Sequence, residues 1–245
     1  MDASVRVFAD PAELAEAAAR AIVEAADEAV GARGRFMLAL AGGETPRDTY
    51  RCLALPAHSE RMPWDRTWIF FGDERCVPPD HPASNYRMAA ETLLGKVSVP
   101  ADHVVRMQGE GEDPEAAAAE YGRRLGEVFG LRRGTLPRFD LVLLGLGLDG
   151  HTASLFPGSP ALKEIFRPVV AVHAAAAVTA QRLTLTFPVL NAAAQVMFLV
   201  AGPEKAKTVK AALHDGAALP AGMVRPEDGQ LVWMLDRAAA SLLAT

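Results

Sequence analysis

The sequence contains little cysteine and no long apolar run. Its two cysteines, Cys52 and Cys76, fit neither a zinc-ligand nor a redox spacing, and so low a count is typical of proteins from reducing compartments. No window approaches the roughly 18 apolar residues of a membrane-spanning helix. The first ten residues carry no basic segment followed by an apolar one. We therefore expect a cytoplasmic protein without a membrane partner.

Blocks of like charge and the common catalytic motifs are also missing. The net charge of -5 is spread along the chain, and basic residues do not gather into a stripe, so nucleic acid is not an expected partner. The chain has no G-x-S-x-G, H-E-x-x-H, Walker or C-x-x-C motif. No pair of its six histidines has metal-ligand spacing. We expect a protein that needs no cofactor and no metal.

Apolar runs alternate with alanine-rich segments of helical period, a pattern typical of parallel strands joined by helices. Half of the 245 residues are apolar, and we expect residues 1–245 to form a single α/β domain with a mainly parallel sheet flanked by helices. The predicted strands are residues 5–9, 36–41, 68–71, 104–107, 140–144, 169–172, 183–187 and 196–201. The predicted helices are residues 11–32, a segment that opens at Pro46, and residues 85–94, 114–129, 203–213 and 237–243.

Three loops that follow predicted strands are rich in glycine or charge. Ligands of such sheets bind at the carboxyl ends of the strands, so these loops are the candidate site. In the first, Gly42 and Gly43 precede a helix start, and free backbone N–H groups there suit a phosphate. A plain turn is an equally good interpretation of this loop alone. The second loop places Asp73, Glu74 and Arg75 after an apolar strand, although a solvated surface loop would look similar.

The third loop follows the most apolar predicted strand and contains Asp149 and His151, two residues apart. It includes a literal Gly145-x-Gly147-x-x-Gly150, but prolines soon after it leave no room for the long helix that a dinucleotide-binding motif requires. Most lone histidines are structural. An imidazole beside a carboxylate in a glycine-built loop is nevertheless a good general-base candidate, because its ordinary pKa of about 6.5 suits neutral pH.

Two further cations are candidates for binding an anion. Arg182 stands at the head of a predicted strand and Lys205 follows another. Either could bind a phosphate or a carboxylate. Each is weak evidence alone, because surface cations are common.

Together, these loops resemble the family of 6-phosphogluconolactonases, which is related in fold to glucosamine-6-phosphate deaminases and ribose-5-phosphate isomerases. The resemblance rests on motifs in the family's order along nearly the whole chain: Gly42-Gly43-x-Thr45-Pro46, Gly72-Asp73-Glu74-Arg75-x-Val77-Pro78, Ser84-Asn85, Gly145-x-Gly147-x-Asp149-Gly150-His151-Thr152-Ala153-Ser154-Leu155-Phe156-Pro157, Arg182-Leu183-Thr184-Leu185-Thr186, Lys205 and Trp233-x-Leu235-Asp236. Deaminases of this fold carry a glutamate where this chain has Phe156, which favours the lactonase. The resemblance implies a modified Rossmann fold. We expect a monomer, although the sequence carries no direct signal of oligomeric state.

The resemblance also implies a substrate, 6-phosphoglucono-1,5-lactone, and a place in the oxidative pentose phosphate pathway. We expect His151 to activate water, Asp149 to orient the imidazole, and Arg75 to meet the negative charge on the carbonyl oxygen. The phosphate would be held by five residues and groups: the amides of Gly42 and Gly43, Thr45, Arg182 and Lys205. Asp73 is a further candidate for substrate binding, and the sequence leaves open whether Asp73 and Glu74 touch substrate or only brace Arg75.

Two alternatives remain open on the sequence alone. One is a deaminase or pentose-phosphate isomerase on the same scaffold, and the other is a non-catalytic sugar-phosphate sensor. Against the sensor, the chain offers no spare segment for a helix-turn-helix, and sensing alone would not require the pair of Asp149 and His151.

Overall fold

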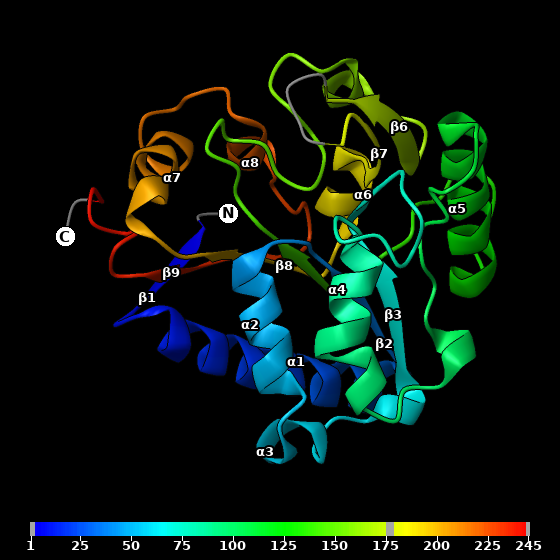
Figure 1. Ribbon diagram of the computed structural model, residues 1–245, viewed down its shortest axis with the longest axis horizontal. Helices are drawn as coiled ribbons and strands as arrows, with labels where there is room; N and C mark the ends of the chain where they lie inside the picture. The colour runs from blue at the N-terminus through cyan, green and yellow to red at the C-terminus, as the bar shows by residue number, and fades with distance from the viewer. Residues whose placement is uncertain (1–2, 175–178, 244–245) are drawn as a thin grey trace.

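Six parallel strands form the central sheet. The structure is a computed structural model that describes residues 3–174 and 179–243 (Figure 1). The strand order is β1-β9-β8-β5-β2-β3, and every neighbouring pair is parallel. In chain order the strands are β1 (Ser4–Phe8), β2 (Phe36–Leu40), β3 (Thr67–Phe71), β5 (Leu141–Leu144), β8 (Gln195–Val200) and β9 (Gln230–Asp236). All residues of β2 and β5 are buried, as expected for strands covered on both faces.

Helices flank this sheet, and the longest begins where the sequence predicts. The side chain of Asp10 accepts a hydrogen bond from the N–H of Glu13 and caps α1 (Pro11–Arg33), which ends at Gly34 in the left-handed conformation. The other α-helices are α2 (Glu44–Leu53), α3 (Pro56–Ser59), α4 (Asn85–Thr92), α5 (Pro114–Phe129), α6 (Phe187–Ala192), α7 (Ala206–Leu213) and α8 (Pro220–Met223). Short 3-10 helices span Trp64–Arg66, Leu94–Lys96, Ala101–His103, Pro160–Lys163 and Pro203–Lys205.

A second sheet, with three antiparallel strands, departs from the sequence prediction. Its order is β4 (Asp73–Arg75), β7 (Gln181–Leu185) and β6 (Val169–His173). The sequence pattern assigns residues 169–172 and 183–187 to the parallel sheet, so their placement is a correction, and Phe187 begins α6 instead of ending a strand. Helix α5 packs against β6 and β7, and Figure 1 shows this small sheet beside α5.

The strand predicted over residues 104–107 does not form. Val104 makes one isolated parallel bridge to Ile69 of β3. Beyond it, the hydroxyl of Tyr121 accepts a hydrogen bond from the N–H of Phe71 and donates one to the carbonyl of Phe71. Because a side chain from α5 occupies this edge of β3, the neighbouring backbone cannot extend the ladder.

The helix predicted over residues 237–243 is also wrong. The segment forms successive turns, with hydrogen bonds from Ala240 N–H to Asp236 O and from Leu243 N–H to Ala240 O. A helix of seven residues is marginal without strong packing.

The last parallel strand, β9, is absent from the predicted strands, although its run of apolar residues resembles that of the other buried strands. Among the described residues, no helix could cross a membrane.

Candidate active site

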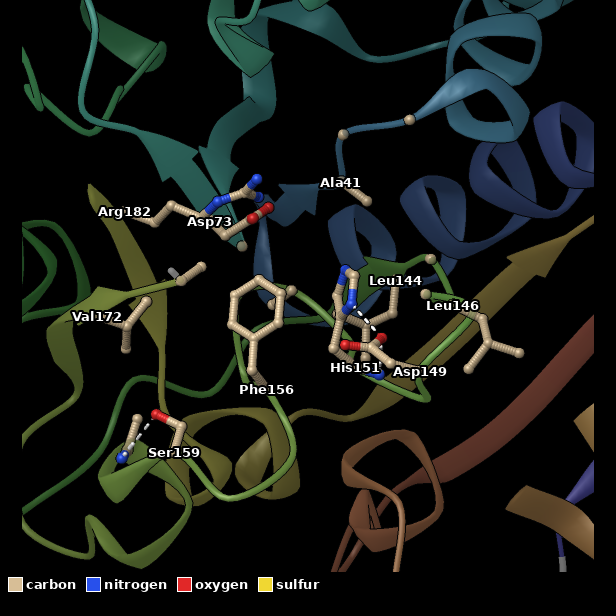
Figure 2. A pocket seen from close by; sticks show the side chains of 18 of the residues that line it. Ala41, Asp73, Leu144, Leu146, Asp149, His151, Phe156, Ser159, Val172 and Arg182 are labelled. Atoms are coloured by element: carbon tan, nitrogen blue, oxygen red, sulfur yellow. Dashed lines mark hydrogen bonds and ion pairs between the residues drawn. The ribbon is translucent and has the colours of Figure 1, made fainter. Parts of the chain in front are cut away.

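A cavity of about 1450 Å³ lies at the carboxyl edge of the parallel sheet. Its walls include the segments that follow β8, β5, β2 and β3, four strands adjacent in the sheet. This is the position at which ligands bind in open α/β sheets. All nine residues predicted as site residues line it: Gly42, Gly43, Thr45, Asp73, Arg75, Asp149, His151, Arg182 and Lys205. Figure 2 shows several of these side chains around the cavity.

Asp149 and His151 form a hydrogen-bonded pair on the cavity wall (Figure 2). The ring atom Nδ1 of His151 lies 2.6 Å from Oδ1 of Asp149, and the side chain of His151 is 30% exposed. Burial raises the pKa of Asp149, but hydrogen bonds and the charge of His151 outweigh it and leave that pKa below its ordinary value. An ionised carboxylate only accepts hydrogen bonds. Nδ1 therefore carries a hydrogen, and in the neutral ring Nε2 has the free lone pair.

Glycine makes the loop of this pair possible. The N–H of Gly147 donates to the carbonyl of His151 at 2.8 Å, and the N–H of Gly150 donates to the carbonyl of Gly147 at 3.0 Å. Gly150 has a φ of +85°, which L residues with side chains rarely adopt. A Cβ on Gly147 would lie 2.1 Å from Nδ1 of His151. The imidazole thus lies directly against the backbone at residue 147.

The first glycine loop is anchored at its first residue, Ala41. The hydroxyl of Tyr50 accepts from the N–H of Ala41 and donates to its carbonyl. Gly43, with a φ of +106°, precedes the first residue of α2. The first N–H groups of a helix have no partners within it, so this end of α2 offers donors and a favourable dipole to an anion. The carboxylate of Glu44 pairs with Arg47 at 2.8 Å.

The charged side chains of β4 point alternately into the cavity and away from it. Successive residues of a strand point to opposite faces, and Asp73 and Arg75 line the cavity whereas Glu74 does not. Glu74 is 3% exposed and accepts hydrogen bonds from the N–H groups of Arg75, Asn85 and Tyr86. Burial raises the pKa of Glu74, although these hydrogen bonds oppose the shift. Glu74 thus braces the β4 backbone and the start of α4.

Arg75 and Arg182 are cross-strand neighbours. They lie opposite each other in the β4–β7 ladder, so both project to the cavity face. Arg75 donates from Nη1 to the carbonyl of Ala83 at 2.5 Å, and Arg182 donates from Nε to the carbonyl of Thr179 at 3.2 Å. Within the described residues neither forms a salt bridge with a carboxylate, and the buried Nε of Arg75 has no hydrogen-bond partner. Two guanidinium groups that form no direct ion pair in the described part of the chain can bind an anion at this wall.

Lys205 approaches the cavity from the segment after β8. Its Nζ donates to the carbonyl of Leu146 at 2.7 Å, which ties it to the loop of Asp149 and His151. The carboxylate of Asp236 in turn accepts from the N–H of Gly202, three residues before Lys205. The cation is therefore held at a defined place on the wall.

Phe156 is a site residue whose structural role the sequence does not reveal. Its ring centroid lies 4.5 Å from that of His151, and the guanidinium carbon of Arg182 lies 5.5 Å from it. Figure 2 shows the ring between the imidazole and the arginine. No sequence signal points to this contact, because Arg182 comes from a distant strand. Among residues 3–174 and 179–243, no group of three or more His, Cys, Asp or Glu side chains could hold a metal ion.

Comparisons with known proteins agree with this geometry. The model of the family described as glucosamine-6-phosphate isomerases/6-phosphogluconolactonase matches residues 9–233. The chain is 41% identical over 247 residues to a 6-phosphogluconolactonase of Rattus norvegicus, in a match that covers 98% of this chain and 93% of the relative. It is 37% identical to a 6-phosphogluconolactonase of Nostoc sp., over the whole length of both.

The fold is also similar to that of solved structures. The 6-phosphogluconolactonase from Trypanosoma cruzi superposes with a TM-score of 0.89 at 32% identity, covering 100% of this chain and 99% of that one. The mainly parallel sheet flanked by helices is therefore shared with a solved relative over its full length.

Proposed function

The chain belongs to the family of glucosamine-6-phosphate isomerases and 6-phosphogluconolactonases, and we propose that His151 is the general base with which it opens its lactone substrate. The enzyme hydrolyses 6-phosphoglucono-1,5-lactone to 6-phosphogluconate, a step of the oxidative pentose phosphate pathway. The observation that carries the proposed mechanism is the pair of Asp149 and His151 in a cavity that also contains the cations and the glycine turn of an anion site.

The reaction begins at Nε2 of His151. A water molecule attacks the lactone carbonyl carbon while Nε2 accepts its proton, and Asp149 stabilises the imidazolium through the hydrogen bond to Nδ1. The tetrahedral intermediate then collapses, the bond from the carbonyl carbon to the ring oxygen breaks, and the imidazolium returns the proton to that oxygen. General-base catalysis of this kind supplies roughly 10²- to 10⁴-fold in rate.

Negative charge that develops on the carbonyl oxygen requires a fixed donor. Arg75 lines the cavity, and the hydrogen bond from its Nη1 to the carbonyl of Ala83 fixes the guanidinium there. A preorganised donor of this kind stabilises an oxyanion more than the neutral carbonyl. We assign this role to Arg75.

The phosphate end of the substrate binds to five groups: the backbone N–H groups of Gly42 and Gly43, Thr45, Arg182 and Lys205. Their support is the exposed start of α2 and the presence of both cations among the residues that line the cavity. Binding energy from this distant group fixes the carbonyl beside His151. Asp73 accepts a hydrogen bond from a sugar hydroxyl or acts through the neighbouring arginines.

We further propose that the enzyme works in the cytoplasm as a monomer, with residues 1–245 as one domain, and that it needs neither cofactor nor nucleic acid. The low cysteine content and the dispersed charge support this setting. Sedimentation of the purified protein tests the oligomeric state.

Product formation by the purified protein tests the function. We expect hydrolysis of 6-phosphogluconolactone well above the spontaneous rate, measured as acid release in a weakly buffered solution. Release of ammonia from glucosamine 6-phosphate, without lactone hydrolysis, would instead identify a deaminase. Phe156, an apolar ring where deaminases of this fold carry a glutamate, favours the first result.

A further inference from the structure

A buried cluster behind the cavity wall connects three segments of the site. It consists of Asp73 in β4, Asn85 at the start of α4 and Ser154 in the loop after β5, and we call it the Asp73 cluster. Asn85 is 2% exposed and Ser154 is fully buried. Asp73 is the member that lines the cavity.

We propose that Ser154 and Asn85 are positioning residues that hold the Asp73 carboxylate beside Arg75 and Arg182, so that the two cations are kept in place for substrate. This proposal rests on the proposed function, because it assumes that Arg75 and Arg182 bind the lactone substrate. It adds Ser154 and Asn85 to the residues that act in the reaction.

Both oxygens of the carboxylate are engaged from opposite sides. The hydroxyl of Ser154 donates to Oδ2 of Asp73 at 2.6 Å, and Nδ2 of Asn85 donates to Oδ1 at 3.0 Å. Nδ2 also donates to the Asp73 carbonyl at 2.9 Å. Hydrogen bonds to a charged acceptor are shorter and stronger than neutral ones. Two buried donors therefore define where the charge of Asp73 lies.

The donors are themselves fixed by other segments of the site. The backbone N–H of Ser154 donates to the hydroxyl of Thr184, which faces Asp73 across the β4–β7 ladder. The backbone N–H of Asn85 donates to Glu74 at 2.7 Å. The side chain of Asn85 also packs on Gly42, where a Cβ would lie 2.0 Å from Oδ1 of Asn85. The cluster thus joins the first glycine loop, β4 and the third loop.

The charge of Asp73 is needed because two guanidinium groups share one face of β4 and β7. Burial and the positive charge of Arg75 lower the pKa of Arg182, whereas the charge of Asp73 raises it. Figure 2 shows Asp73 beside Arg182. A carboxylate held there offsets the repulsion between Arg75 and Arg182. Without it, one guanidinium would turn away from the other and from the cavity.

Double-mutant cycles test the proposal. Ser154→Ala, Asp73→Asn and the double variant are compared by KM and kcat for the lactone and by the Kd of 6-phosphogluconate in calorimetry. We expect Ser154→Ala to raise KM and Kd about tenfold, the loss that corresponds to one hydrogen bond to a charged group. In the Asp73→Asn background the same change should add less than about twofold, because residues that act through one group are not additive. Asn85→Ala forms a second cycle in case Ser154→Ala does not fold.

Thr67→Val is the matched control. Thr67 is fully buried and donates its hydroxyl to the carbonyl of Pro63 at 2.8 Å, but it lies at the amino end of β3, away from the cavity. A general folding defect reduces the amount of active enzyme and lowers the apparent kcat without changing KM or Kd. We expect Thr67→Val to leave KM and Kd unchanged.

The outcomes separate the two proposals. Additive effects of Ser154→Ala and Asp73→Asn, or unchanged KM and Kd in both cluster variants, would overturn the positioning role while leaving an active lactonase. A wild-type protein without lactonase activity would overturn the proposed function, and the cycle in Kd would still report on the cluster. A wild type that neither turns over the lactone nor binds 6-phosphogluconate would overturn both.

Discussion

Asp149 and His151 are the residues whose chemistry is recognisable from the sequence alone. They lie two positions apart in one glycine loop, so local sequence is sufficient to bring the carboxylate within 2.6 Å of the ring. Phe156 and Ser154 lie in the same loop, but their partners Arg182 and Asp73 come from distant strands. Such contacts depend on how distant strands pair, and the pattern of residues along the chain does not reveal that pairing.

Lys205→Ala is expected to weaken substrate binding much more than it slows turnover. The ammonium lies on the cavity wall and is tied to the carbonyl of Leu146, and we place it at the phosphate, far from the reacting carbonyl. Removal of a group that binds substrate and transition state equally well raises KM with little change in kcat. We expect KM to rise about 10- to 100-fold, from the loss of a charged hydrogen bond, as measured by initial rates.

Lys207→Ala is the control for this prediction. Lys207 is exposed on α7, close to Lys205 in the chain but outside the cavity lining, so its loss should leave KM unchanged. A fall in kcat with an unchanged KM for Lys205→Ala would assign the ammonium to the reacting end instead.

Among the helices and strands, long segments with clear caps could be predicted and short ones could not. Helices α1 and α5 begin at Asp-Pro pairs that give an N-cap and a first helical residue. Strand β4 has only three residues, all charged. It forms because its backbone pairs with that of β7. Residues 104–107 look like a strand by composition, but Tyr121 takes the hydrogen-bonding position that they would need.

Gly42→Ala should damage the junction between the first loop and α4. The new methyl group would lie 2.0 Å from Oδ1 of Asn85, and Asn85 cannot move without losing its hydrogen bonds to Asp73. Overpacking of this kind typically costs about 1–3 kcal/mol. We expect a loss of that size in the free energy of unfolding by urea, together with a raised KM.

Gly31→Ala is the matched substitution inside α1. A Cβ at Gly31 meets nothing within 4 Å, so alanine should stabilise the helix by about 0.5–1 kcal/mol. If Gly42→Ala were as stable and as active as the wild type, the close packing of Asn85 on this glycine would be contradicted.

Glu164, after the 3-10 helix Pro160–Lys163, should contribute pH-dependent stability. Hydrogen bonds from the N–H groups of Arg167 and Phe166 and from the Arg167 side chain lower the pKa of Glu164 to about 2, from an ordinary 4.5. Because the folded-state pKa is depressed, the stabilisation is present above pH 4.5 and is lost as the pH falls through 2.

The comparison of Glu164→Gln with the wild type tests this shift. Urea unfolding at a series of pH values should show the wild type more stable above pH 4.5 and the difference shrinking towards pH 2. Parallel stability curves for the two proteins across this range would rule out a depressed pKa.

In the molecule as a whole, one geometric rule accounts for the site. The loops after β2, β3, β5 and β8 meet because these strands are parallel and adjacent, so a search of strand ends identifies residues far apart in sequence. The antiparallel sheet of β4, β7 and β6 could not be predicted in the same way. The sequence of β6 and β7 does not distinguish them from strands of the main sheet, and β4 has no strand signal of its own. Only tertiary pairing places Arg75 opposite Arg182.

The proposed mechanism depends above all on the imidazole of His151 activating water in this cavity. Its sharpest test is the initial rate of 6-phosphogluconolactone hydrolysis by wild type and His151→Ala, followed as acid release at constant pH and corrected for the spontaneous reaction. We expect a kcat about 10²- to 10⁴-fold lower in the variant, with KM changed only slightly and the Kd of 6-phosphogluconate retained. A His151→Ala variant with the wild-type kcat would show that another group activates the water.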